Sequence, residues 1–467
     1  MVEKALNAQK YFILKSQQFF IKEIFDKLSY KKIFQKSKVW LLPYLYFDIR
    51  YIMNKSINYK NLILTTEGIL FDLNHYKIYE LDKEHINEFI CVYHGEIKEE
   101  NSFVNKLIKE KDKSVYDLKI VKVNMTNFCN LKCSYCFANE GTYNKAKRVF
   151  DKKLIDKLLV FLKLYQSVQY ITFFGGEPLL NIDGIEYLCQ QVKLIRPDIE
   201  FYCQTNGTIM NEKIQNLINQ YGIKFTLSVD GTKEDNDRNR VFKDNKGSFD
   251  IVDQNYKCFK NNVLSIEATY DGKSKYNKKE VADYLSRKFN CSNVTVCDLF
   301  GSSRSIEFTD PKADIEEILR STNIPVNRTR ELLLGFFTHT TQCYFCSAGT
   351  QLINIDSDGK IYPCHLLIDK GKKYVLGDLN SFDKDEFEMK RKKFSSILKK
   401  CSYSKCRNCV VSWNCTQCFA AKENFNFYDC NKMQENAFEI FEEIAKEIKK
   451  GKLKEILLKL KGAVKYV

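Results

Sequence analysis

The sequence predicts an α/β protein whose core is a parallel sheet, partly closed into a (β/α)6 barrel of the TIM type. Six strand-like runs alternate with five helix-like runs between residues 118 and 299, a pattern typical of parallel α/β sheets. Polar residues and glycines follow several of these strands, at the edge where such sheets place their active sites. An N-terminal α+β region and a C-terminal cysteine-rich region flank this core.

The composition favours a globular protein of about three domains. The chain has 467 residues, of which 44% are hydrophobic and 13% aromatic, enough to bury a large core. Its net charge of +15 could attract nucleic acid or an acidic peptide. The lysines are scattered without a long basic block, which favours a solvated surface. We therefore expect no nucleic-acid partner.

Cysteine usage and the N-terminus together indicate a reducing, low-oxygen, cytoplasmic setting. Eighteen cysteines in a chain of this length do not resemble a secreted disulfide scaffold. The first ten residues lack the apolar core of a signal peptide. The longest apolar run nearby, 39–47, contains Pro43 and is too short to span a membrane. We expect no membrane partner.

The N-terminal region combines predicted helices near 8–35 with a meander of three strands and a further helix. The strands cover 62–65, 68–72 and 77–81. A turn at Glu67 and Gly68 joins the first two strands, and Asp82 caps the helix. Strands followed by a helix resemble the modules of ribosomal-peptide maturases that capture a leader peptide as an additional strand. A plain packing domain is the alternative interpretation.

The central region alternates regularly between the two element types. The predicted strands cover 118–125, 168–174, 199–203, 223–229, 263–269 and 292–299. The predicted helices cover 151–165, 183–194, 211–220, 248–260 and 277–288. A cysteine loop, a glycine turn and two polar segments each follow one of the first four strands.

The first strand leads into a loop with three cysteines, Cys129, Cys133 and Cys136, spaced C-x3-C-x2-C. Three thiolates from one loop can hold three corners of a four-iron, four-sulfur (4Fe-4S) cluster and leave the fourth iron open for chemistry. A zinc loop or three unrelated cysteines are the alternatives. The loop resembles the signature of radical S-adenosylmethionine (SAM) enzymes. The resemblance implies that SAM chelates the open iron, and that Tyr135 lies near its adenine.

The second strand ends in Gly175, Gly176, Glu177 and Pro178. Paired glycines let a ligand approach the backbone closely. In this position the segment resembles the GGEP motif of the same family, which contacts the amino group of SAM. The resemblance implies that Gly175, Gly176 and Glu177 bind the cofactor.

The third and fourth strands end in further polar residues, which could be ordinary turn and cap residues. Together they resemble the family's remaining SAM contacts. Ser228 and, twelve residues on, Arg240 match a serine and an arginine that hold the methionine carboxylate, which a planar guanidinium pairs with bidentately. Asn206 matches a ribose or neighbouring contact. The resemblance also implies the reaction: one electron from the cluster cleaves SAM to a 5′-deoxyadenosyl radical that abstracts hydrogen from the substrate. A reductase such as flavodoxin or ferredoxin would supply that electron.

A second set of cysteines lies near the C-terminus. Its members are Cys343, Cys346, Cys364, Cys406, Cys409, Cys415, Cys418 and Cys430. A predicted hairpin over 352–364, turning at Asp358 and Gly359, returns Cys364 towards Cys346. By spacing alone these thiols fit two tetrathiolate sites, of zinc or of iron and sulfur.

The context resembles the SPASM extension of radical SAM enzymes, which carries two auxiliary 4Fe-4S clusters. The resemblance assigns Cys343, Cys346, Cys364 and Cys418 to the first cluster, and Cys406, Cys409, Cys415 and Cys430 to the second. The chain departs from the pattern at Cys415 and Cys418, which are spaced C-x2-C instead of the frequent C-x3-C. Cys343 also lies unusually close to Cys346, so the first cluster could keep an open iron for a substrate thiolate. Cys401 is then a spare candidate ligand.

We therefore expect four segments: an N-terminal domain, a radical SAM core, a SPASM domain and an amphipathic C-terminal helix or two. Their bounds are 1–112, 113–305, 306–435 and 436–467.

The arrangement resembles ribosomal-peptide maturases, and we expect a cysteine-containing, leader-bound precursor peptide as substrate and a thioether as product. Carbon–carbon crosslinking, epimerisation or another radical modification is the alternative. Anaerobic sulfatase maturases carry an aspartate where this chain has His365, which argues against formylglycine formation; a structural, surface or proton-handling role is open for this histidine. A basic zinc protein that binds nucleic acid is the distant alternative, and it leaves the first cysteine loop unexplained.

Overall fold

The computed structural model describes ten stretches of the chain. They are residues 56–60, 62–73, 77–107, 116–299, 310–320, 328–337, 344–407, 409–415, 418–420 and 430–464. The helices predicted near residues 8–35 and the predicted ligand Cys343 lie outside these stretches.

The largest element is a nine-stranded sheet in the order β10-β9-β8-β7-β6-β5-β11-β12-β13. Six parallel strands follow the predicted ranges: β5 (Ile120–Thr126), β6 (Tyr170–Gly175), β7 (Glu200–Thr205), β8 (Lys224–Ser228), β9 (Val263–Tyr270) and β10 (Val294–Asp298). On β5, Val121 and Val123 are fully buried whereas Lys122 between them is not. One face of the sheet therefore packs on a hydrophobic core, and the other carries polar side chains.

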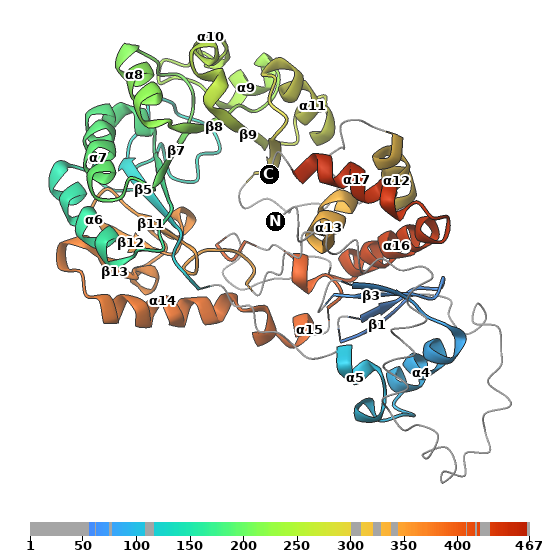
Figure 1. Cartoon of the computed structure of the whole chain (residues 1–467). Helices are drawn as coiled ribbons and strands as arrows, with labels where there is room; N and C mark the ends of the chain where they lie inside the picture. The colour runs from blue at the N-terminus through green and yellow to red at the C-terminus, as the bar shows by residue number, and fades with distance from the viewer. Residues whose placement is uncertain are drawn as a thin grey trace.

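Helices cover the outer face of these parallel strands (Figure 1). They are α6 (Lys152–Leu164), α7 (Ile182–Ile195), α8 (Glu212–Tyr221), α9 (Lys233–Asn239), α10 (Phe249–Phe259) and α11 (Lys278–Lys288). Side-chain caps set where several of them begin: Asp151 accepts from Leu154 N, and Asn277 forms a capping box with Glu280. The α/β alternation predicted from sequence is confirmed, and α9 is an addition to it.

The hairpin of the cysteine-rich region joins the same sheet. Strand β11 (Leu352–Ile355) runs parallel to β5, with Ile353 opposite Val121, and continues through β12 (Lys360–Tyr362) to β13 (Gly377–Asp378). Gly359 makes the turn with φ +87°, a conformation that favours glycine. This pairing covers the edge of β5, which a six-stranded sheet would leave open. It also brings Cys364, two residues after β12, next to the barrel.

The N-terminal sheet is antiparallel and has four strands. They are β1 (Ile57–Tyr59), β2 (Leu62–Leu64), β3 (Ile69–Asp72) and β4 (Lys77–Glu80). Helices α4 (Lys83–Tyr93) and α5 (Val104–Leu107) follow. Asp82 caps α4 by accepting from His85 N at 2.9 Å, as predicted. The predicted three-stranded meander is wrong by one strand, because β1 is only three residues long and has no clear alternation.

The C-terminal helices pack on this N-terminal sheet (Figure 1). Phe71 on β3 contacts Phe441, with ring centroids 4.7 Å apart, and Phe336, with centroids 5.8 Å apart. The helices of this region are α12 (Pro311–Arg320), α13 (Arg328–Phe337), α14 (Lys384–Leu398), α15 (Ser404–Arg407), α16 (Cys430–Lys449) and α17 (Leu453–Val464). The predicted amphipathic tail is therefore two helices, α16 and α17, and the first begins before residue 436.

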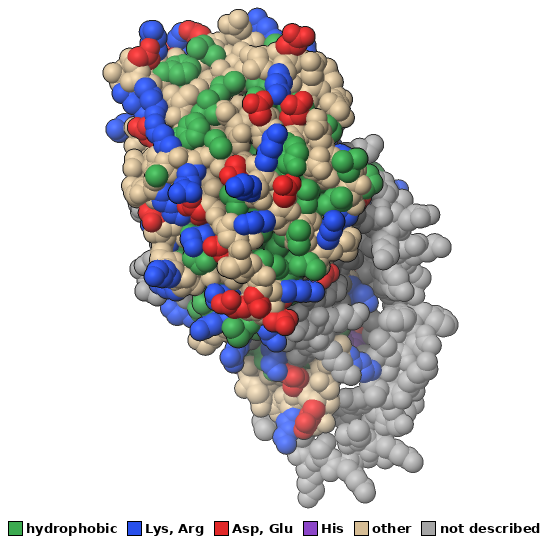
Figure 2. Space-filling view, turned by 90° about the vertical axis from the view of Figure 1, so that its left-hand side faces the viewer, with side chains coloured by type: hydrophobic (Ala, Val, Ile, Leu, Met, Phe, Trp, Pro, Cys, Tyr) green, Lys and Arg blue, Asp and Glu red, His purple; other side chains and the backbone are tan. Residues whose placement is uncertain are grey.

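Short 3-10 helices connect several of these elements. They are η4 (Glu99–Asn101), η5 (Pro178–Asn181), η6 (Lys260–Asn262), η7 (His365–Leu367), η8 (Lys372–Tyr374), η9 (Leu379–Ser381), η10 (Lys400–Ser402) and η11 (Ser412–Asn414). Among the described residues, no helix combines the length and apolarity needed to cross a bilayer. Figure 2 shows one face of the molecule, on which basic and acidic side chains are interspersed.

Candidate active site

The three-cysteine loop leaves the carboxyl end of β5 and is held by the end of α9 and the residues that follow it. The amide of Lys132 donates to Val241 O at 2.8 Å, and that of Ser134 donates to Asn239 O at 3.0 Å. The hydroxyl of Ser134 also donates to Asn239 Oδ1 at 2.8 Å. The loop is therefore fixed by backbone and side-chain hydrogen bonds from a segment more than 100 residues away.

The thiols in this loop are half-buried and grouped together. Burial raises the pKa of Cys129 to about 12, and the nearby Glu177 and Cys133 add to the effect. Burial also raises the pKa of Cys133, which the guanidinium of Arg240 opposes. Such thiols stay protonated in the free protein, and binding a metal would release their protons.

The turn after β6 packs directly against the cysteine loop, backbone on backbone. A Cβ added to Gly175 (φ +133°) would lie 2.1 Å from Thr126 O, and one added to Gly176 would lie 2.1 Å from Phe128 O. The amides of Gly176 and Glu177 donate to these same carbonyls, at 3.1 and 3.0 Å. Any side chain at either glycine would displace the loop.

A third glycine completes this contact. A Cβ on Gly141 (φ +87°) would lie 2.4 Å from Gly176 Cα. Sequence reasoning missed Gly141, since a lone glycine after the cysteine loop resembles any turn residue.

Glu177 is fully buried and its carboxylate faces into the protein. It accepts hydrogen bonds from Thr205 Oγ1 at 2.8 Å, Asn206 N at 2.8 Å and Leu179 N at 3.1 Å. These bonds lower its pKa, but burial outweighs them and raises it to about 7. The side chain thus ties the end of β6 to the end of β7.

Asn206 joins the end of β7 to the cysteine loop. Its Nδ2 donates to Asn130 Oδ1 at 3.0 Å and lies 3.6 Å from Cys129 Sγ. Asn130 Nδ2 donates in turn to Thr208 Oγ1 at 2.8 Å. In this structure the Asn206 amide therefore positions the first cysteine.

Arg240 lies under the cysteine loop in a buried network with Tyr135 and Asp230. Its Nη1 donates to Tyr135 Oη at 2.8 Å and lies 3.9 Å from Asp230 Oδ1. The Tyr135 hydroxyl donates to Asp230 Oδ2, and Thr269 N donates to Asp230 Oδ1 at 3.0 Å. Burial raises the pKa of Asp230, against the effect of Arg240. Ser228 is half-buried at the end of β8, two residues before this aspartate.

Sequence reasoning named Arg240, Tyr135 and Ser228 but not Asp230, whose strand-end position resembles an ordinary turn. In the structure, its buried ion pair with Arg240 distinguishes Asp230 from a turn residue.

Seven of the eight described cysteines from Cys346 onward form two groups, and the eighth, the spare candidate Cys401, is exposed. Burial raises the pKa of Cys364 to about 12, and the neighbouring thiols of Cys346 and Cys418 raise it further. Burial likewise raises the pKa of Cys346 to about 11, with Cys418 adding to it. These three residues, which we call the first C-terminal group, therefore lie close enough to interact. Cys343, their predicted partner, is outside the described residues.

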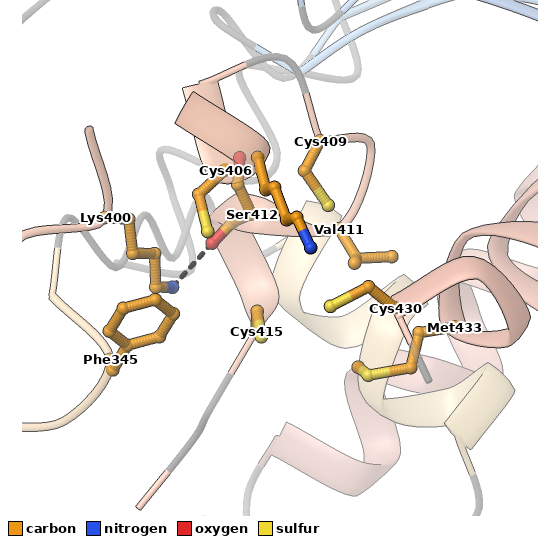
Figure 3. A pocket seen from close by; sticks show the side chains of 10 residues that line it. Phe345, Lys400, Cys406, Cys409, Val411, Ser412, Cys415, Cys430 and Met433 are labelled. Carbon is orange, nitrogen blue, oxygen red and sulfur yellow. Dashed lines mark hydrogen bonds between the residues drawn. The ribbon is translucent and has the colours of Figure 1, made fainter. Parts of the chain in front are cut away.

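The second C-terminal group lines a pocket (Figure 3). Its four thiols come from two segments and are Cys406, Cys409, Cys415 and Cys430. Burial raises the pKa of Cys406 to about 11, and the other three thiols add to it. The structure thus brings together the four residues predicted for the second auxiliary site.

A single-ion site and an iron–sulfur cluster differ in the spacing of their ligands. Within the described stretches, no three His, Cys, Asp or Glu side chains converge closely enough to hold one metal ion. A 4Fe-4S cluster takes one thiolate at each iron, so its ligands surround a larger volume.

His365 is half-buried and directly follows Cys364 of the first C-terminal group. Its ring is 4.8 Å from that of Phe174 and 5.6 Å from that of Phe137. Burial, reinforced by the ammonium of Lys122, lowers the pKa of His365 well below its usual value. Lys122 Nζ itself lies 4.3 Å from the Phe174 ring centre and 3.4 Å from Gln204 Oε1. A neutral, half-buried histidine therefore lies beside a cation on the inner face of the sheet.

Residues 123–287 match the sequence model of the radical SAM superfamily. The chain contains a radical SAM domain. This match begins in β5 and ends in α11, so it includes the three-cysteine loop, the GGEP turn and Arg240.

Among curated proteins, the chain is 25% identical over 300 residues to the radical SAM cyclopropyl synthase TigE of Paramaledivibacter caminithermalis, covering 59% of this chain and 56% of TigE. It is 24% identical over 363 residues to the cysteine-type anaerobic sulfatase-maturating enzyme of Clostridium perfringens, covering 66% of this chain and 92% of that enzyme. It is 37% identical to an uncharacterized protein of Methanocaldococcus jannaschii, covering 28% of this chain and 45% of that protein. The chain thus spans about half the length of TigE and of the archaeal protein.

A solved structure has a similar fold over much of this chain. This structure is native anSMEcpe with bound AdoMet and the Cp18Cys peptide. Its TM-score is 0.55 at 20% identity, over 71% of this chain and 99% of that one.

Proposed function

We propose that this protein is a radical SAM maturase that installs a thioether crosslink, between a cysteine sulfur and a carbon of another residue, in a ribosomally made peptide. The observation that carries the proposal is the presence of three separate cysteine groups in one chain. One lies at the carboxyl ends of the parallel strands, and the other two lie in the C-terminal region.

The loop cysteines Cys129, Cys133 and Cys136 would hold the SAM-binding 4Fe-4S cluster. When bound, the cluster and SAM supply the radical that abstracts hydrogen from the substrate. The chain's own residues orient the cofactor. Arg240, buried beneath the loop, would pair with the methionine carboxylate together with Ser228, and the Gly175–Gly176 turn would bring backbone groups to the amino group.

The two C-terminal groups would hold auxiliary 4Fe-4S clusters. The second has four thiols around one pocket and would be fully ligated. The first has Cys346, Cys364 and Cys418, with Cys343 as its proposed fourth ligand. Without Cys343, one iron would stay open to a thiolate of the substrate peptide.

A peptide substrate is supported by the shared fold with anSMEcpe, whose solved structure contains a bound peptide. The N-terminal sheet has two edge strands, β1 and β4, that could take up a leader peptide by strand addition. A flavodoxin or ferredoxin would donate electrons.

The residue at position 365 argues for thioether formation over formylglycine formation. The relative from Clostridium perfringens matures sulfatases by name, and the family resemblance places an aspartate at the position of His365 in such enzymes. Here a neutral imidazole stands between two aromatic rings and near a lysine. No carboxylate is available at that position to accept a proton.

The test is anaerobic reconstitution with SAM, a reductant and a cysteine-containing peptide from a short reading frame beside the gene. We expect 5′-deoxyadenosine, and a peptide that loses two hydrogens and one free thiol per crosslink, because one S–H and one C–H bond are replaced by one S–C bond. Hydrogen loss with every thiol still free would indicate a carbon–carbon crosslink, and an unchanged mass with inverted residues would indicate epimerisation. Either result would contradict the thioether.

A further inference from the structure

The segment that follows Cys136 has an unusual backbone. Residues 137–149, which we call the connecting segment, lead from the three-cysteine loop towards α6 without forming a helix or a strand. Four residues other than glycine adopt a φ between 47° and 58° within it: Asn139, Glu140, Tyr143 and Asn144. This conformation is uncommon outside glycine and persists only where surrounding contacts enforce it. Contacts with other parts of the fold therefore hold the shape of this segment.

Two ion pairs join the connecting segment to the turn between β11 and β12. The ammonium of Lys145 lies 2.8 Å from Asp356 Oδ2. Arg148 Nε lies 3.2 Å from Asp358 Oδ1. Asp356 is only 3% exposed, and its Oδ1 also accepts from Asp358 N at 3.0 Å and from Lys360 N at 2.9 Å. One buried carboxylate therefore shapes the hairpin turn and holds the connecting segment against it.

The same two parts of the chain also meet beside the cysteines. Phe137 directly follows Cys136, and His365 directly follows Cys364. The rings of Phe137 and His365 lie 5.6 Å apart, centre to centre. The ring contact and the ion pairs thus join the three-cysteine loop to the hairpin that ends at the first C-terminal group.

We infer that Lys145 and Asp356 are positioning residues that set the separation between the SAM site and the first C-terminal group. The inference rests on the proposed function, in which a radical forms on a substrate carbon at the SAM site while the substrate sulfur is held at the first C-terminal group. These two atoms can form a bond only at close range, and a displacement of about 1 Å can slow such a step about 100-fold. Without the ion pair, SAM cleavage would continue but bond formation would become inefficient.

The experiment compares variants of the whole protein in the anaerobic assay of the proposed function. Lys145→Met removes the ammonium, and Lys145→Arg keeps a cation. Asp356→Asn removes the negative charge but keeps an oxygen for the amides of the turn. Lys360→Met is the matched control, because Lys360 pairs with Asp378 at 3.6 Å, an ion pair between β12 and β13 that does not involve the connecting segment.

Two quantities are measured: the 5′-deoxyadenosine formed, and the modified peptide per 5′-deoxyadenosine. In Lys145→Met and Asp356→Asn we expect SAM cleavage within about twofold of the wild type, and a ratio of modified peptide that is about tenfold lower or more. Lys145→Arg and Lys360→Met should keep the wild-type ratio. An unchanged ratio in Lys145→Met and Asp356→Asn would overturn the inference whether or not SAM cleavage falls, because a merely structural role lowers both quantities together.

Hydrogen exchange distinguishes failure of this inference from failure of the proposed function. Tyr143 N donates to Ala138 O at 2.8 Å, and Gly359 N donates to Asp356 O at 3.0 Å. Both amides should exchange faster in Lys145→Met than in Lys360→Met, because the ion pair joins their segments. Unchanged exchange would overturn the inference even if the wild type modifies a peptide. Faster exchange in Lys145→Met, in a protein whose wild type modifies no peptide, would support the positioning role of the ion pair and contradict the proposed function.

Discussion

Arg240 donates a hydrogen bond to the hydroxyl of Tyr135 at 2.8 Å, across 105 positions of sequence. This contact joins the segment after α9 to the middle of the three-cysteine loop. Arg240 and Asp230 are buried and Tyr135 is half-buried, so the loop, the end of β8 and the guanidinium form one unit. The unit places a fixed positive charge under the thiols and beside the proposed carboxylate site.

Arg240→Lys should weaken SAM binding about tenfold or more. An ammonium cannot reproduce the planar fork of a guanidinium, and the loss of one charge-assisted hydrogen bond, about 1.5–3 kcal/mol, exceeds the 1.4 kcal/mol of a tenfold change. The measurement is equilibrium binding of SAM to the reconstituted protein. Arg196→Lys is the control, because Arg196 is equally buried and forks on Asp198 at 2.9 and 2.6 Å, but precedes β7, away from the carboxyl end of the sheet. Equal affinities in the two variants would refute the role of Arg240.

Gly176→Ala should remove the iron bound by the three-cysteine loop and leave the iron of the two C-terminal groups in place. Its Cβ would lie 2.1 Å from Phe128 O, a backbone atom that cannot move without the cysteine loop. We expect iron content to fall by about four per chain, the content of one cluster. Gly222→Ala is the control: Gly222 has φ +63°, but its Cβ would meet nothing within 4 Å. Full iron in Gly176→Ala would show that the close approach does not matter.

Glu177 should make stability fall as the pH rises from about 4.5 to about 7. Its pKa is about 7 in the folded protein against an ordinary 4.5, so the folded state binds this proton more tightly than the unfolded chain. The contribution is complete below about pH 4.5 and is lost as the pH rises to about 7, a change of about 3 kcal/mol.

Anaerobic urea unfolding of wild type and Glu177→Gln across this range tests that sign. The free energy of unfolding of the wild type, minus that of the variant, should decrease with rising pH and then level off. A constant difference would mean that the pKa of Glu177 is the same in the folded and unfolded protein, and an increasing difference would mean that folding lowers it. Either result would contradict the raised pKa.

Glu442→Gln should loosen the N-terminal sheet from α16. The Glu442 carboxylate accepts from Thr66 N at 2.8 Å and from Thr66 Oγ1 at 2.7 Å, and an amide offers only one oxygen. A cost of about 1–1.5 kcal/mol should speed amide hydrogen exchange in residues 62–72 up to about tenfold. Glu443→Gln, which affects the ion pair with Lys446 on the same helix, should leave exchange unchanged. Equal protection in both variants would show that the hydrophobic contact alone holds the sheet.

The parallel core could be predicted from sequence because each of its elements has a local pattern. The six strands alternate with helices whose caps and apolar spacing lie within a few residues of each other. The pairing of Ile353 with Val121 has no such pattern, since it joins segments far apart in the sequence. The hairpin was therefore expected in a separate domain, although its strands extend the central sheet.

The candidate site likewise contains residues that the sequence predicts and residues that only the structure shows. Spacing alone singled out Cys129, Cys133 and Cys136 as candidate ligands, because ligands from one loop carry their geometry in their separation. Spacing could not show that the carboxylate of Glu177 faces inward, or that Asp230 is buried beside Arg240. Those properties depend on three-dimensional neighbours that come from other parts of the chain.

The most direct test of the whole account is the iron and sulfide content of anaerobically purified protein, compared with a variant in which Cys129, Cys133 and Cys136 are all alanine. Three 4Fe-4S clusters predict about twelve irons per chain in the wild type and about eight in the variant. About four irons in the wild type, accompanied by zinc and falling to none in the variant, would contradict the auxiliary clusters and leave a single radical SAM site.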